Sequence, residues 1–188
     1  MAFYSSQLPQ LSMIATTVSS LSEQAVKDLP AALARVEQFL ANVPAAELDA
    51  LSDLLHAAIA FGLLSNFLTE ASTYATTKTN HWPGSGYDRA ADDPHLIARF
   101  GRFVSSLEAL RALVDEATVL TENASPEALR ASAIARRYSI SVGSQFVSST
   151  IELLGASAVR MKFGYDTRWR TILDHARFHP SRTQLQPV

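Results

Sequence analysis

Apolar residues recur along most of this chain at the spacing of an α-helix. Leu48, Leu51, Leu55, Ile59 and Leu63 follow the i, i+3, i+4 pattern, which predicts a helix over residues 45–77. The apolar stripe of this segment is wide, so we expect it to pack on more than one side. Alternation with a period of two residues is scarce, and the pattern therefore predicts an all-α protein.

Helix start and stop signals divide the rest of the chain. Pro30 suits a first helical turn, Asp93-Pro94 is a typical N-cap followed by proline, Ser125-Pro126-Glu127 repeats that signal, and Gly155 suits a helix end. The predicted helices, in addition to 45–77, are 10–27, 30–42, 94–121, 126–154 and one from about 166 to just before Pro180. Residues 78–92 form the clear loop.

Three long helices joined by short connections favour an antiparallel bundle. We expect an antiparallel four-helix bundle over residues 46–188, in which the terminal helix supplies or caps the fourth position. Residues 1–45 form an extra N-terminal helical segment. Gly62 lies in the middle of the helix over 45–77, where glycine costs about 1 kcal/mol relative to alanine. A close approach of another helix or of a cofactor is the expected reason.

Composition narrows the function without naming it. The 188 residues are 47% hydrophobic and 18% charged, with a net charge of −2 and no cysteine. This balance gives no broad attraction for nucleic acid or an anionic membrane surface, and disulfide and thiolate chemistry are excluded. The apolar stretch 54–68 is too short to cross a bilayer. We expect a cytoplasmic protein with no nucleic-acid or membrane partner.

Few residues point to chemistry by themselves. Gly84 and Gly86 lack the strand and third glycine of a dinucleotide motif, so a connector is the better interpretation. His175 and His179 are four residues apart, which places both on one face of the predicted terminal helix. They either line a pocket, where imidazoles suit proton transfer, or lie at the surface. Further ligands are scarce, and we predict no metal site.

The order of features between residues 48 and 183 resembles the C-terminal domain of acyl-CoA dehydrogenases. It is closer still to the flavin-dependent monooxygenases of the same fold, of the dibenzothiophene and hydroxyphenylacetate type. The likeness is carried by the small-residue segment 57–62, the loop 78–97 that ends in Asp93-Pro94, the turn 153–158 around Gly155, and the segment 168–180 around Trp169. Without the resemblance, Trp169 would be an aromatic packed on the bundle between solvent-facing arginines.

The resemblance implies a flavin, FAD or FMN, and a set of site residues. In that family the flavin lies between the helical domain and a β-domain, and a neighbouring protomer's bundle contributes to the cofactor site. Lys78, Gly155, Trp169 and Arg170 match positions near the cofactor. His175 matches a family histidine and His179 lies within one residue of a second, so both are expected in proton transfer around the reactive flavin.

Three departures from the family pattern matter. Thr171 replaces the usual aspartate after Trp-Arg. No glutamate follows Glu152, and Ser52 stands at the alternative position of a catalytic carboxylate, so ordinary acyl-CoA desaturation is disfavoured. Finally, residues 1–45 match neither the family's N-terminal helical domain nor its β-domain.

These observations leave two functions open. The chain is a component or truncated form of a flavin-dependent oxidoreductase of the monooxygenase-like branch, acting on a small organic or acyl substrate. Alternatively, it is a cofactor-free bundle that binds a partner or catalyses a flavin-independent reaction in the old substrate cavity. Because a β-domain is missing from the sequence, flavin binding requires a partner chain, or the flavin is absent. A homo- or hetero-oligomer formed through the bundle is expected.

Overall fold

A computed structural model describes residues 13–79, 84–155, 160 and 164–177. These residues form six α-helices and one short 3₁₀ turn, and the described ranges contain no β-strand. The elements are α2 (Ile14–Lys27), α3 (Leu29–Leu40), α4 (Ala45–Thr77), η1 (Ala90–Asp92), α5 (Pro94–Glu122), α6 (Ala128–Leu154) and α7 (Tyr165–Arg177). The all-α prediction is confirmed.

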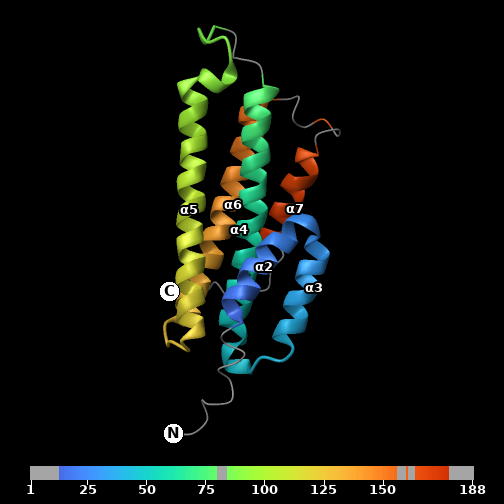
Figure 1. Ribbon diagram of the computed structural model, residues 1–188, viewed down its shortest axis with the longest axis vertical. Helices are drawn as coiled ribbons and strands as arrows, with labels where there is room; N and C mark the ends of the chain where they lie inside the picture. Colours follow the sequence, from blue (N-terminus) through green and yellow to red (C-terminus); the bar gives the residue numbers. More distant parts are fainter. Residues whose placement is uncertain (1–12, 80–83, 156–159, 161–163, 178–188) are drawn as a thin grey trace.

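The helices α4, α5, α6 and α7 run alternately up and down the long axis of the molecule (Figure 1). α4 contacts both α5 and α6, and α7 packs on α6 and α4. This is the antiparallel bundle that the three long apolar patterns predicted. α2 lies across α4, and α3 follows it beside the lower half of α4 (Figure 1).

Local signals set the helix ends. The Asp28 carboxylate accepts a hydrogen bond from the Ala31 amide at 3.0 Å at the start of α3, and Asp93 accepts one from His95 at 2.8 Å at the start of α5. Each fills one of the unpaired amides of a first helical turn. Gly155 ends α6 with a φ of +76°, a conformation that glycine adopts without steric cost. α6 begins at Ala128, slightly later than the predicted start, after a turn that contains Pro126.

α4 is the central helix, and it is buried around most of its circumference. It is also the one described helix that is long and apolar enough to meet the length and composition test for a membrane span, but 67% of its most apolar window is buried in the bundle. Its Leu54, Ala58 and Phe67 share one core with α5, α6 and α7, and Ile14 of α2 belongs to the same core. Packing on more than one side explains its wide stripe.

Gly62 is the point at which α2 meets α4. A Cβ at this position would lie 2.1 Å from the backbone oxygen of Ser22 in α2, so only glycine permits the two helices to approach this closely. The helix–helix alternative for Gly62 is therefore confirmed. A second apolar cluster joins Leu21, Val36 and Leu55, from α2, α3 and α4. Residues 14–40 are thereby packed directly onto the central helix.

Candidate functional site

A cavity of about 740 Å³ lies between α3, α4 and α7. The face of α3 forms an apolar wall, α4 contributes two polar side chains, and α7 contributes three. The lining residues are Leu29, Pro30, Leu33, Val36, Glu37 and Leu40 from α3 or its first turn, Ser52 and His56 from α4, and Thr171, Asp174 and His175 from α7. A volume of this size suits a small organic molecule.

Two histidines face each other in this cavity. The rings of His56 and His175 are stacked, with centroids 5.4 Å apart and an interplanar angle of 28°. Nε2 of His175 lies 3.2 Å from the backbone oxygen of His56. A carbonyl oxygen only accepts hydrogen bonds, so His175 donates from Nε2, and the neutral ring carries its lone pair on Nδ1.

The environment of His175 favours the neutral imidazole. Burial lowers its pKa to about 4, and the positive charge of Arg136 acts in the same direction, against the hydrogen bond to His56. Desolvation disfavours the charged form of a histidine, and a nearby cation adds to that effect. At neutral pH the ring is therefore an uncharged hydrogen-bond partner, and the lowered pKa makes it a weak base.

Arg136 of α6 lies behind the histidine and is only 2% exposed. One of its Nη atoms donates to the backbone oxygen of His175 at 3.1 Å, which ties α7 to α6. Burial lowers the pKa of Arg136 to about 10, and the opposing charge of Asp53 on α4 partly offsets this. The guanidinium stays charged at neutral pH, and it joins α6 to α7 as a buried cation.

The other predicted site residues lie elsewhere. Lys78 is exposed directly after α4, and Gly155 follows α6, so both lie at the end of the bundle where α5 begins (Figure 1). His56 precedes Lys78 by 22 positions on or next to the same helix, a rise of about 33 Å at 1.5 Å per residue. Lys78 and His175 therefore do not meet within one chain.

The cluster around Trp169 divides into a structural part and an exposed part. Trp169 is half-buried and packs against the main core, as the simpler interpretation expects. Arg170 is exposed, whereas Arg168 forms an ion pair with Glu70 of α4 at 2.7 Å. His179, the second predicted catalytic histidine, falls outside the described residues. Its role stays a prediction.

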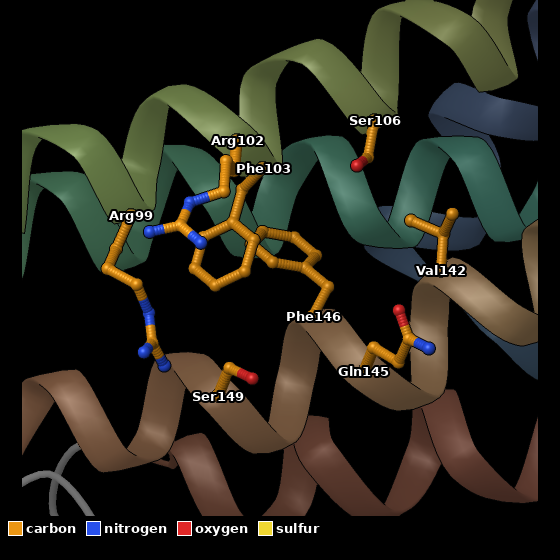
Figure 2. Close-up of a pocket in the computed structure, with 8 residues that line it drawn as sticks. All are labelled: Arg99, Arg102, Phe103, Ser106, Val142, Gln145, Phe146 and Ser149. Atoms are coloured by element: carbon orange, nitrogen blue, oxygen red, sulfur yellow. The ribbon is translucent and has the colours of Figure 1, made fainter.

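A second cavity, of about 360 Å³, lies between α5 and α6 and differs in chemistry (Figure 2). Arg99 and Arg102 reach into it from α5; Arg102 lies beside the rings of Phe103 and Phe146, whose centroids are 4.4 Å apart, and Arg99 extends toward α6. Arg99 lies 3.8 Å from the Glu152 carboxylate. The remaining lining residues are Ser106, Val142, Gln145 and Ser149. We call this cavity the α5/α6 groove.

Sequence reasoning did not anticipate three parts of the α3/α4/α7 cavity. His56 was visible only as a polar interruption in the apolar run of α4, which was the signal that could have marked it. Arg136 gave no signal, because a single arginine in a helix is usually exposed. The wall from α3 could not be found, since it depends on how residues 14–40 fold back onto α4.

Comparison with known proteins agrees with the helical fold. The family model described as "Acyl-CoA dehydrogenase, C-terminal domain" matches residues 54–179, which include α4 from Leu54 onward, α5, α6 and α7. This chain belongs to that family. The matched range begins after α3, so the N-terminal helices that complete the cavity lie outside it.

The curated relatives that this chain matches are monooxygenases, and the similar solved structures include a butyryl-CoA dehydrogenase from Megasphaera elsdenii. A dibenzothiophene monooxygenase of Mycolicibacterium goodii is 25% identical over 164 residues, which make up 81% of this chain and 40% of that protein. Methanesulfinate monooxygenase MsuC from Pseudomonas fluorescens has a TM-score of 0.68 at 23% identity, covering 74% of this chain and 39% of that one. FMN-bound TdsC from Paenibacillus sp. A11-2 also has a TM-score of 0.68, at 21% identity, covering 73% and 37%. The chain thus spans about two-fifths of the length of these relatives.

Proposed function

We propose that this chain is the helical component of a flavin-dependent monooxygenase that acts on a small organic molecule in the α3/α4/α7 cavity. The observation that carries the proposal is His175, an imidazole held neutral beside an apolar wall, in a domain whose relatives are monooxygenases. An uncharged imidazole beside an apolar wall can accept a hydrogen bond from a substrate at neutral pH and so orient it.

The residues at the far end of the bundle fit part of a flavin site. Lys78 is an exposed cation, and a Cβ built on Gly155 would have no atom within 4 Å, so the backbone there is open to a ligand. An ammonium group would offset the charge of a flavin phosphate, and an open glycine turn lets a cofactor approach the backbone. When bound, the flavin would supply the redox chemistry. FMN is favoured over FAD because a similar solved structure holds FMN.

This arrangement requires more than one chain. FMN is much shorter than the rise of about 33 Å between His56 and Lys78, so one chain cannot place both ends of its bundle on one cofactor. We infer that Lys78 and Gly155 of one copy serve a site whose His175 comes from another copy, or that a partner chain completes each site. The proposal therefore includes a homo- or hetero-oligomer.

His175 would act through Nδ1, since Nε2 donates to the His56 backbone. In the neutral ring Nδ1 can accept a hydrogen bond from a donor group of the substrate and orient it. Ser52 and Thr171 line the same cavity and offer hydroxyl groups to orient the substrate. Asp174 also lines it, but it is an exposed carboxylate and is not held for α-proton abstraction.

The test combines flavin binding with solution mass. FMN is titrated into the purified chain, alone and with candidate β-domain partners, while flavin absorbance and mass are recorded. We expect binding by an oligomer, and Lys78→Glu should weaken it at least about tenfold through charge reversal next to the phosphate. Lys27→Glu, an exposed lysine at the end of α2, is the matched control. Absence of flavin uptake under every condition contradicts the proposal.

One observation favours the alternative of a cofactor-free binding protein. The cavity already has walls from α3, α4 and α7 of a single chain, so it does not need a β-domain to be enclosed. In that case the chain binds its small molecule as a monomer and takes up no flavin. The same titration distinguishes the two functions, because only the monooxygenase component predicts an FMN spectrum.

A further inference from the structure

The apolar wall of the α3/α4/α7 cavity comes from a part of this chain that the family model does not cover. Leu29, Leu33, Val36 and Leu40 follow one another at intervals of four, three and four residues. This spacing puts them on one face of α3. That face lines the cavity, so residues outside the matched range 54–179 determine what the cavity accepts.

α3 is held in place by its own chain. Asp28 caps its first turn, and Val36 is 1% exposed in the cluster that it forms with Leu21 and Leu55. α2, which precedes it, is pressed against α4 at Gly62. The wall is therefore a packed part of the fold, and the cavity does not depend on a second protein for this side.

The charges of the lining have one sign. Glu37 on α3 and Asp174 on α7 are both exposed carboxylates, and neither forms an ion pair with another residue in the described parts of the chain. No lysine or arginine is among the described lining residues. An anion entering this cavity would meet two negative charges and lose its hydration against apolar side chains.

We propose that the α3/α4/α7 cavity binds an apolar small molecule that is neutral or carries a positively charged nitrogen, and that it does so on a single chain without flavin. Burial of its apolar part against α3 supplies the affinity. The two carboxylates exclude anionic ligands, carboxylates and phosphates included, and tolerate a cation. The idea that this ligand is also the substrate rests on the proposed function. The binding of the ligand does not depend on that function.

The experiment compares three probes with one skeleton. 1-Naphthalenemethanol, 1-naphthylmethylamine and 1-naphthoate are titrated into the full chain by calorimetry at pH 7.5, without flavin. We expect the alcohol and the amine to bind, and 1-naphthoate to bind at least about tenfold more weakly. Binding of 1-naphthoate as tight as that of the alcohol, or no binding by any probe, overturns the proposal.

Substitutions then locate the binding. Leu33→Gln should weaken all three probes by a similar factor, whereas Leu129→Gln, at a residue 54% exposed on α6, should weaken none. The double change Glu37→Gln and Asp174→Asn should bring 1-naphthoate to within about threefold of the alcohol, because it removes both charges. Retained discrimination in the double variant overturns the charge argument even if Leu33→Gln loses its fold.

A last variant separates this cavity from the α5/α6 groove. Arg102→Gln removes a cation of the groove, and we expect all three affinities to stay unchanged. If Arg102→Gln abolishes probe binding and Leu33→Gln does not, the probes bind in the groove and the proposal fails. Failure of the proposed function has a different signature, since probe binding would persist while FMN is not taken up.

Discussion

The two cavities of this molecule differ in how the chain builds them. The α5/α6 groove is formed by two consecutive helices, and its arginines point from the surface of α5 toward α6 (Figure 2). The α3/α4/α7 cavity is formed by helices that lie far apart in the sequence, and the buried Arg136 supports it from behind. The first has two cations at its mouth, whereas the second has two carboxylates and a neutral histidine.

This difference indicates where mutations should matter. The ion pair of the groove lies near the surface: the Arg99 and Glu152 side chains are 29% and 76% exposed and 3.8 Å apart, so this pair contributes little. The α3/α4/α7 cavity depends on buried polar contacts and on one close helix crossing. Disturbing those contacts should cost both stability and the geometry of His175.

The largest expected effect on the free energy of unfolding comes from the buried Arg136, and Arg102 of the α5/α6 groove serves as its comparison. Arg136→Leu removes the hydrogen bond to the His175 backbone and a buried positive charge whose field is opposed by the charge of Asp53. We expect a loss of about 3–5 kcal/mol in the free energy of unfolding, measured by urea denaturation. Arg102→Leu in the groove should change it by no more than about 0.5 kcal/mol. Equal losses in the two variants would contradict the distinction between the cavities.

The next effect concerns the crossing of α2 and α4 at Gly62, which positions α2 and the α3 helix that follows it. Gly62→Ala places a Cβ against the backbone of Ser22, which cannot move as a side-chain tip can. We expect a loss of about 3 kcal/mol, at the upper end for overpacking, together with weaker binding of the naphthyl probes. Gly101→Ala is the control, because nothing lies within 4 Å of its added Cβ. Helix propensity alone should then stabilise the protein by up to about 1 kcal/mol.

The smallest expected effect is a pH dependence of the free energy of unfolding, which arises from His175 in the α3/α4/α7 cavity. The pKa of His175 is lowered from 6.5 to about 4 in the folded protein, so the unfolded chain binds the proton more readily between these values. Stability is therefore complete above about pH 6.5 and falls as the pH drops toward 4. Between pH 7 and 4.5 we expect a loss of about 2 kcal/mol from this group.

His175→Leu should remove that pH-dependent part of the loss. The comparison is made by denaturation of both proteins at pH 7 and 4.5, so that the other titrating groups cancel. If the parent and the variant lose the same stability on acidification, the environment inferred for His175 is wrong.

Much of the fold could be predicted from the sequence. The bounds of α4, the capped start of α5 at Asp93-Pro94 and the end of α6 at Gly155 all follow from local patterns. Helix periodicity, capping side chains and left-handed glycine are properties of a few neighbouring residues. They are readable without knowing what the helix packs against.

The candidate site was less accessible to such reasoning. His175 was anticipated through its place on the terminal helix and through the family likeness, but its partner His56 was not. The His56 ring lies beside that of His175 only because α7 packs on α4 across 119 positions of sequence. The roles expected for Lys78, Gly155, Trp169 and Arg170 stay predictions.

The sequence by itself determined that this chain forms long antiparallel helices and resembles one family, because both are encoded in spacing and in the order of short segments. The tertiary structure decided that α3 closes a cavity, that Arg136 is buried behind His175, and that Lys78 lies at the opposite end of the bundle. Burial, desolvation and charge proximity depend on which distant segments pack together. A helix pattern specifies the face that each segment buries, but it does not name the partner that covers it.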